Sequence, residues 1–396
     1  MLDKRTHIEF RCFVKINNQL WVSYDGANGI FVIDLDNYTV KYMFSFDGIP
    51  FLKEYCHSSK IIQDENNLYF FPGFTESQPV INTYNMLSGR KKEISIPKDW
   101  CGMFETSGVV QVKRYVYIIQ WEISRGIYYL NLDTDTVIKD EGISEKLIQF
   151  KGKKCAVSVE DNIGIISLQG TDKFVEIDFS TKAFRERKIP VVGVDIFKVV
   201  KKDDFYYILQ QDSCVVYRWN IEMNEIKKYE VSQVERTSSI PPFWDVLFRQ
   251  DEIVLLGGSA NSIVKINTEN DVVSKIDWPD RYEFLSQRKF QFTCCEVPVY
   301  QCDNFILLYQ NSDNVILKLN LIDNTVEAHE IEADKNVDRF FESVFWGQIN
   351  EKGYFVERAC RQVEFFLDKV YSFTNKIYCE KTNIGNTIYH AWDGEL

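Results

Sequence analysis

The sequence predicts an all-β fold, a β-propeller of seven or eight four-stranded blades with a short helical C-terminal segment. Three observations lead to this prediction. Short apolar runs recur at a nearly constant spacing, and an Asp or Asn follows each of the first seven runs at a nearly constant distance. Polar turns also separate segments in which apolar and polar residues alternate, which is typical of strands.

The apolar runs set the period of the repeat. Each run follows a polar turn, and successive runs are 42 to 52 residues apart, roughly 48 on average. Four short strands in about 45–48 residues match one propeller blade, whereas β-sandwich arrays do not normally repeat at so short a period. The runs begin at Leu20, Leu68, Val116, Ile163, Phe205, Ile253, Phe305 and Tyr354.

An Asp or Asn closes the next strand-like segment of the first seven repeats, 14 to 17 residues after the start of the run. Because these side chains bond nearby backbone N–H groups, we expect each one to stabilise the turn out of a strand. One more strand-like segment precedes each run and another follows the marker, which makes four strands per repeat. The markers are Asp34, Asn85, Asn131, Asp178, Asn220, Asn267 and Asn320.

The sequence leaves the number of blades open. One propeller domain is expected over 1–396, with repeats beginning near 8, 56, 105, 152, 194, 242, 291 and 340. In the eighth repeat, FESVFWGQINEKGYFVERA (341–359) predicts a first hairpin. Val363, Phe366, Leu367 and Val370 then follow helical spacing, so 361–396 is expected to form a helical or closing tail. Seven blades with an appended hairpin and helices, or eight with a degenerate last blade, both fit.

Composition bounds the function. The 58 acidic and 46 basic residues give a net charge of −12, which argues against a nucleic-acid partner. The N-terminal stretch has no apolar signal region, and no run of 18 apolar residues exists, so no membrane insertion is expected. The ten cysteines are scattered without a CxxC pair, which favours reduced, mostly buried thiols and a cytoplasmic location.

Several short stretches partly match known phosphate-binding or metal-binding motifs, but none matches the complete pattern. Gly257-Gly258 is followed by the strand-like SANSIVKIN with no GK[ST], so we interpret the pair as relaxed strand-end geometry or a close backbone approach. DTDTVIKDEG (133–142) breaks the calcium-loop pattern and predicts a strand-to-strand turn. The four histidines are isolated, so neither a metal site nor a cofactor is expected.

Two repeats resemble a known family. IVLLGG (253–258), and more weakly LYFFPG (68–73) with Tyr84 downstream, resemble the kelch repeat of kelch-like and galactose-oxidase-like propellers. The resemblance implies a propeller fold. Members of that superfamily are often binding scaffolds and sometimes enzymes, so it transfers no site residue to this chain.

The candidate site residues lie in the segments that lead from one predicted blade to the next. In a propeller these connections share one face, beside the channel mouth. Here they place aromatic residues next to carboxylates, a combination suited to sugar stacking or a protein hot spot; the same aromatics would also wedge neighbouring blades together. The candidates are Trp100, Glu105, Trp244, Asp245, Trp278, Asp280, Tyr282, Glu342 and Trp346.

The sequence therefore favours a non-catalytic binding scaffold that recognises a protein or glycan-like ligand through its interblade loops. The alternative is a carbohydrate-active propeller enzyme, a hydrolase or lyase. It would use channel-mouth carboxylates among Glu105, Asp245, Asp280 and Glu342 as general acid and base.

Overall fold

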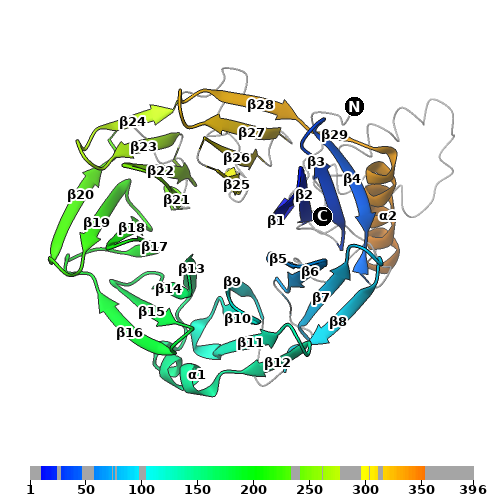
Figure 1. Ribbon diagram of the computed structural model, residues 1–396, viewed down its shortest axis with the longest axis horizontal. Coiled ribbons are helices and arrows are strands. Elements are labelled where there is room, and N and C mark those ends of the chain that lie inside the picture. Colours follow the sequence, from blue (N-terminus) through cyan, green and yellow to red (C-terminus); the bar gives the residue numbers. More distant parts are fainter. Residues whose placement is uncertain are drawn as a thin grey trace, which may run out of the picture.

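The computed structural model describes residues 10–24, 28–46, 58–73, 75, 78–97, 104–232, 241–260, 262–276, 296–302, 304–310 and 315–352. Only the backbone is described at 11, 296–299, 310, 342 and 345–352. Seven antiparallel sheets of consecutive strands stand around a common axis, as Figure 1 shows. The predicted β-propeller is confirmed, with seven blades.

Each blade is a meander whose first strand lies nearest the axis (Figure 1). Blades 1 to 4 consist of β1 (Phe10–Ile16), β2 (Gln19–Tyr24), β3 (Ile30–Asp34), β4 (Thr39–Phe44); β5 (Lys60–Asp64), β6 (Asn67–Phe71), β7 (Val80–Asn85), β8 (Lys91–Ser95); β9 (Thr106–Val112), β10 (Tyr115–Gln120), β11 (Ile127–Asn131), β12 (Thr136–Lys139); and β13 (Cys155–Glu160), β14 (Ile163–Leu168), β15 (Lys173–Asp178), β16 (Ala183–Lys188). Blades 5 to 7 consist of β17 (Ile196–Lys202), β18 (Phe205–Gln210), β19 (Val215–Asn220), β20 (Glu225–Glu230); β21 (Phe243–Arg249), β22 (Glu252–Gly257), β23 (Ile263–Asn267), β24 (Val273–Ile276); and β25 (Glu296–Gln301), β26 (Phe305–Gln310), β27 (Val315–Asn320), β28 (Val326–Glu330).

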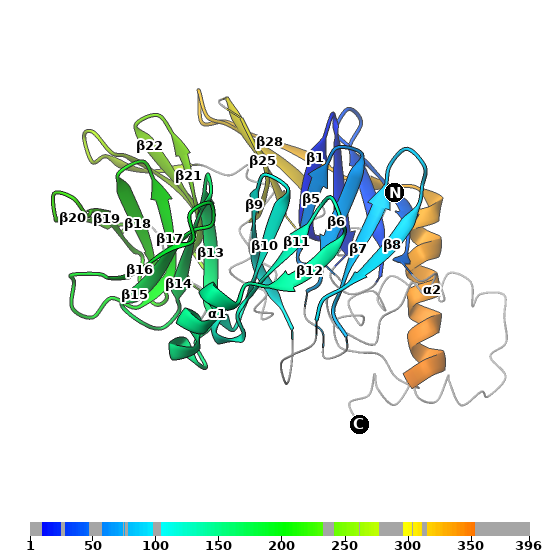
Figure 2. The same ribbon diagram turned by 60° about the horizontal axis from the view of Figure 1, so that its bottom comes forward.

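Antiparallel pairing gives the propeller two different ends. The turns between first and second strands and between third and fourth strands lie at one end, which we call the turn face. The second-to-third connections and the segments between blades lie at the other end, the loop face. Figure 2 shows the blades standing side by side around the ring in an oblique view.

The seven Asx markers act as the sequence predicts. In each one the side-chain oxygen accepts a backbone N–H two or three residues later, at the turn between the third and fourth strands. In blade 1, Oδ1 of Asp34 accepts the N–H of Asp36 at 2.9 Å, and in blade 5, Oδ1 of Asn220 accepts that of Met223 at 2.9 Å. Equivalent bonds form at Asn85, Asn131, Asp178, Asn267 and Asn320.

The hydrophobic core is divided among the seams between blades. One cluster joins Val116 and Ile118 of blade 3 to Tyr69 and Phe71 of blade 2, and similar clusters occupy the other seams. Successive side chains of a strand point to opposite faces of the sheet. Each central strand therefore contributes apolar residues to the seams with both neighbouring blades. Every blade therefore depends on the two beside it.

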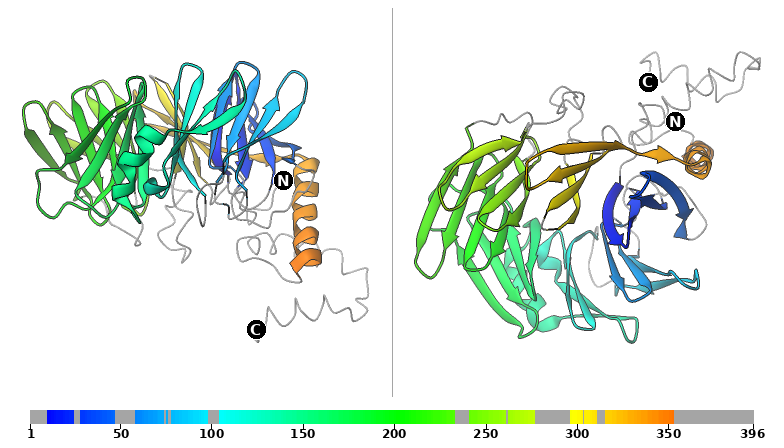
Figure 3. Two further views of the ribbon diagram at one scale, coloured as in Figure 1. Left: turned by 90° about the horizontal axis from the view of Figure 1, so that it is seen from below. Right: turned by 45° about the horizontal axis from the view of Figure 1, so that its top comes forward.

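The ring closes through the chain that follows blade 7. The short β29 (Glu332–Ala333) pairs in parallel with the outer edge of β4 and gives blade 1 a fifth strand. The helix α2 (Lys335–Lys352) then runs along the outside of blade 1, which Figure 3 shows in two views. Asp334 caps this helix, because its Oδ1 accepts the N–H groups of Asn336 at 2.9 Å and Val337 at 3.0 Å.

The predicted hairpin at 341–359 is wrong over the residues that α2 covers. Val337, Phe340, Phe341 and Val344 follow helical spacing and are all buried, on a cluster that joins blades 7 and 1. Phe340 packs so closely on Gly29 that a Cβ there would lie 2.5 Å from the Phe340 ring. The predicted tail at 361–396 lies outside the described residues.

The glycine pair after β22 is explained by a close approach of two backbone segments, as predicted. A Cβ on Gly258 would lie 2.4 Å from the carbonyl oxygen of Pro241, and the Gly258 N–H donates to the carbonyl of Pro242 at 2.8 Å. A strand-to-strand turn is also confirmed at the start of the predicted stretch 133–142, between β11 and β12, whereas Thr136–Lys139 form β12 itself. The last residues of the stretch instead begin α1 (Glu141–Leu147), because the Asp140 carboxylate accepts the N–H of Ile143 at 3.1 Å.

Three smaller features complete the described part of the chain. The 3₁₀ turns η2 (Ile123–Arg125) and η3 (Ile148–Phe150) lie on the loop face around α1. None of the helices described is long and apolar enough to cross a membrane. Among the described cysteines, Cys12 and Cys155 are buried and Cys214 and Cys302 are partly exposed.

Candidate functional site

The structure places the predicted site residues in three groups. Trp244 and Asp245 lie at the start of β21 in blade 6, and Glu105 directly precedes β9 in blade 3. Glu342 and Trp346 lie in α2, where only the backbone is described. The remaining predicted residues fall outside the described part of the chain; these are Trp100, Trp278, Asp280 and Tyr282.

The innermost strands of four blades carry a β-bulge at the end where they leave the loop face. In blades 5 and 6 the pairing with the second strand shifts between Ile196 and Lys198 and between Phe243 and Asp245. The extra residues are Phe197 and Trp244; blades 1 and 3 have similar shifts near their first residues. Because a bulge leaves one residue outside the ladder and re-aims its side chain, these positions present side chains that regular pairing would not.

Trp244 is an exposed aromatic residue held in place by a neighbouring blade. Its side chain is 41% exposed, whereas Phe197 of blade 5 is only 6% exposed. The two ring centroids lie 5.2 Å apart with an interplanar angle of 43°. One face of the indole therefore rests on blade 5 while much of the rest contacts solvent, so it is positioned without being covered.

An ion pair beside Trp244 joins the same two blades. Nζ of Lys198 lies 2.7 Å from Oδ1 of Asp245, and the two side chains are 13% and 23% exposed. The same Asp245 oxygen accepts the N–H of Val246 at 2.9 Å. Because both groups are mostly removed from water and fixed by partners, this pair supplies a rigid donor and acceptor next to the indole.

Glu105 lies at a different part of the ring. Its carbonyl accepts the N–H of Trp121 at 2.8 Å, and blades 4 and 5 separate it from Asp245 along the ring. On the same rim, Nζ of Lys154 lies 4.2 Å from the Trp121 ring centroid. Burial, opposed by a hydrogen bond with Ser107 and reinforced by the Glu105 charge, raises the pKa of the nearby Cys155 thiol to about 12.

Phe197, Lys198, Trp244 and Asp245 form what we call the inner-rim cluster. It combines an exposed aromatic face with a fixed ammonium and a fixed carboxylate, which are contacts for a sugar ring or a protein side chain. Among the described residues, no group of three or more His, Cys, Asp and Glu is arranged to hold a metal ion. Sequence reasoning found Trp244 and Asp245 but missed Phe197 and Lys198, which lie 47 residues earlier in the chain.

Comparisons with known proteins agree on the architecture. No protein-family model and no curated sequence matches the chain. Among solved structures, a catalytically inactive virginiamycin B lyase from Staphylococcus aureus with quinupristin is 16% identical with a TM-score of 0.56, covering 81% of this chain and 98% of its own. A streptogramin B lyase is 14% identical with a TM-score of 0.54, covering 83% and 95%.

A third similar structure is PorZ, a surface component of the type-IX secretion system of Porphyromonas gingivalis. It is 12% identical with a TM-score of 0.51, and the match covers 82% of this chain but only 38% of PorZ. At these identities the likeness shows the fold alone, a seven-bladed propeller.

Proposed function

We propose that the chain is a non-catalytic binding scaffold that recognises a glycan-like or protein ligand at the inner-rim cluster. The observation that carries this proposal is Trp244, which a β-bulge and the Phe197 ring hold 41% exposed at the loop face. Exposed, pre-positioned indoles are common anchors in sugar sites and protein interfaces because they bury a large area at little entropic cost.

The fixed Lys198–Asp245 pair supports the same function. A ligand that stacks on Trp244 meets a donor and an acceptor whose orientation is already set.

A relationship to kelch-like propellers and a cytoplasmic location remain predictions from the sequence.

The enzymatic alternative requires two carboxyl groups roughly 5–10 Å apart across one pocket. Of its four candidates, Asp245 is engaged by Lys198 and Glu105 belongs to a blade that is not adjacent. The Asp280 and Glu342 side chains are not among those described. Two of the similar structures are lyases by name, but they share too little sequence with this chain to carry an activity to it.

The test compares oligosaccharide binding by the wild type, Trp244→Ala and Tyr115→Ala. Tyr115 is the matched control, because it is also 41% exposed but begins β10 at the turn face. We expect Trp244→Ala to weaken binding of a panel member by about tenfold or more and Tyr115→Ala to leave it unchanged. Equal losses in the two variants, or no loss in Trp244→Ala, would contradict the inner-rim site.

The same variants test a protein ligand. A partner captured by wild type and Tyr115→Ala, but not by Trp244→Ala, supports the proposal. Mass spectrometry of the glycan mixtures detects any product, and turnover would overturn the non-catalytic function. A chain that binds neither a glycan nor a protein would overturn the proposal as a whole.

A further inference from the structure

On the turn face, a groove runs between each blade and the next. Every blade has one structurally equivalent residue position beside its groove. It lies on the third strand, two residues before the Asx marker, and faces the second strand across the ladder. We call it the groove position. The residues there are Val32, Thr83, Tyr129, Glu176, Arg218, Lys265 and Lys318.

In blades 4, 5 and 6 a long side chain at this position spans the groove and contacts the next blade. Arg218 lies 3.7 Å from the centroid of the Phe205 ring and donates to the carbonyl of Thr268 in blade 6 at 3.2 Å. Lys265 is 6% exposed, with its Nζ 2.7 Å from Oδ1 of Asn324 in blade 7. Each of these two side chains spans from one blade to the next.

Blade 4 fills its groove with a carboxylate. Glu176 accepts a short hydrogen bond from the Tyr206 hydroxyl of blade 5. It also accepts one from Nε of Arg187, at 3.2 Å. In this groove, therefore, a carboxylate oxyanion accepts hydrogen bonds from a phenol and from a guanidinium.

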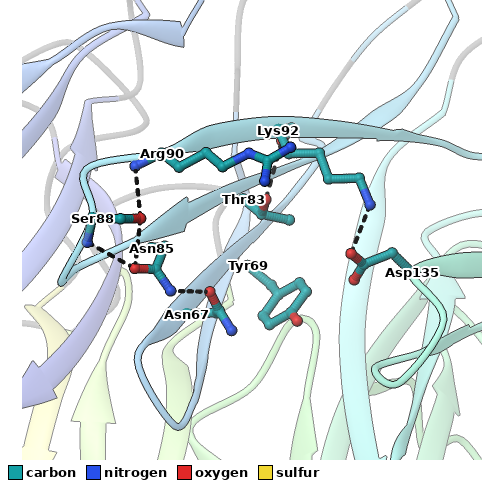
Figure 4. Close-up of a pocket in the computed structure, with 8 residues that line it drawn as sticks. All are labelled: Asn67, Tyr69, Thr83, Asn85, Ser88, Arg90, Lys92 and Asp135. Atoms are coloured by element: carbon teal, nitrogen blue, oxygen red, sulfur yellow. Dashed lines mark hydrogen bonds and ion pairs between the residues drawn. The ribbon is translucent and has the colours of Figure 1, made fainter.

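Blade 2 has only Thr83 at the groove position, and its groove is open. The Thr83 hydroxyl donates to the carbonyl of Lys92 within the same blade at 3.2 Å, so the side chain does not cross to blade 3. A cavity of about 320 Å³ lies there (Figure 4). Val32 of blade 1 is also short, but Trp21 compensates, because its ring lies 5.7 Å from that of Tyr84 in blade 2.

The polar groups of the cavity divide into those used by the fold and those that face the cavity. The amide of Asn85 bonds Asn67 and Ser88, and Lys92 lies 2.7 Å from Asp135 of blade 3 (Figure 4). Within the described part of the chain, the Arg90 guanidinium has no side-chain or carbonyl partner, although it lines the cavity.

Tyr69 supplies a second donor to the cavity. The residue is 3% exposed and lines the cavity. Burial first, and then the charges of Asp135 and Asp64, raise its pKa to about 12. The phenol therefore keeps its proton, and its capacity to donate, across the physiological range.

We propose that the open groove between blades 2 and 3 binds the oxyanion of a small polar ligand, a carboxylate or a phosphate. Arg90 donates to it, as Arg187 donates to Glu176 in blade 4, and the Tyr69 phenol lines the same cavity. The planar guanidinium matches the geometry of both oxyanions, and because Lys92 is paired with Asp135, Arg90 is, among the described residues, the cation of the cavity lining that has no carboxylate partner. This site lies at the turn face and does not depend on the function proposed for the inner-rim cluster.

The experiment titrates acetate and inorganic phosphate separately into the isotope-labelled full chain at constant ionic strength set with chloride. Amide chemical shifts report the site and the affinity. We expect saturable binding of at least one anion, with shifts concentrated in β6 to β8 and at the turn between β11 and β12. Binding of acetate alone identifies a carboxylate ligand, and binding of phosphate alone identifies a phosphate ligand.

Three variants make the titration specific. Thr83→Arg places in this groove the residue that fills the groove of blade 5, and Arg90→Gln removes the donor; each should weaken binding by about tenfold or more. Arg185→Gln is the matched control, since it removes an exposed cation from the outer strand of blade 4, beside a filled groove. It should leave binding unchanged.

Three results would overturn the site: neither anion saturates, Arg185→Gln weakens binding as much as Arg90→Gln, or Thr83→Arg binds like wild type. Thermal unfolding checks that Thr83→Arg is folded. Arg90→Gln decides the question alone if it is not, because this exposed substitution leaves the packing intact.

Discussion

The grooves after blade 4 and after blade 2 share the same pairing of second and third strands and have different contents. In the first, Glu176 connects blade 4 to blade 5 through Tyr206 and is also bound by Arg187 of its own blade. In the second, Thr83 stays within its own blade and leaves a cavity of about 320 Å³. Each groove of this propeller can therefore hold a side chain or an open space, and a short residue at the groove position leaves space where no neighbouring side chain compensates, as Trp21 does in blade 1.

The first prediction concerns truncation of the side chain at the groove positions of blades 4 and 2. Glu176→Ala should lower the free energy of unfolding by about 2–3 kcal/mol, because it leaves a buried phenol and a partly buried guanidinium without an acceptor. Thr83→Ala should cost less than about 1 kcal/mol, since its hydroxyl bonds only within blade 2. Urea unfolding measures both losses of unfolding free energy. Equal losses would contradict the claim that the Glu176 side chain links two blades while the Thr83 side chain does not.

The second prediction converts a filled groove into an open one. Arg218→Thr removes the stacking on Phe205 and the hydrogen bond to Thr268, so we expect a loss of about 1–2 kcal/mol. Thr83→Arg lies three blades away, and the two changes should add within about 0.5 kcal/mol in the double variant. Strong non-additivity in urea unfolding would contradict the treatment of the two grooves as independent.

The third prediction concerns the tyrosine of the open groove at alkaline pH. The pKa of Tyr69 is raised from 10.0 to about 12, so the folded state holds its proton more tightly than the unfolded state does. Its contribution to stability is complete below pH 10 and is lost as the pH rises toward 12. Wild-type stability should therefore fall more steeply across this window than that of Tyr69→Phe. Identical slopes in denaturant titrations would show that Tyr69 is not buried as described.

The smallest effect is expected at the ion pairs that flank the two kinds of groove. Lys92–Asp135 borders the open groove, and Lys227–Asp271 borders the groove that Arg218 fills. Lys92→Met and Lys227→Met should each cost no more than about 0.5 kcal/mol, because the lysine side chains are 48% and 47% exposed. Salt titration should reduce both losses, and a larger loss at Lys92 would reveal a further structural role in the open groove.

The repeat could be predicted from the sequence because its signals are local. Each Asx marker bonds backbone within three residues of itself, so spacing alone reveals the turn. The helix α2 could not be predicted in the same way. Its buried face, including Phe340 and Val344, packs on a blade that lies about 300 residues earlier in the chain, so no local signal of that contact indicated a helix where the hairpin at 341–359 was predicted.

The candidate sites were predictable only in part. The aromatic residue next to a carboxylate in the segment leading into the sixth predicted blade indicated Trp244 and Asp245, but their partners Phe197 and Lys198 belong to another blade and carry no motif. Thr83 is inconspicuous in the sequence. The signal that finds it is an alignment of the seven repeats on the Asx markers, in which the groove position is short in blades 1 and 2 and longer in the other five.

The most direct test of the groove comparison is a crystal structure of Thr83→Arg. We predict that the new guanidinium lies between blades 2 and 3 and donates to the turn between β11 and β12, as Arg218 donates to Thr268, and that the cavity is gone. An arginine that extends into solvent above an unchanged cavity would contradict the claim that the residue at this position opens or closes the groove.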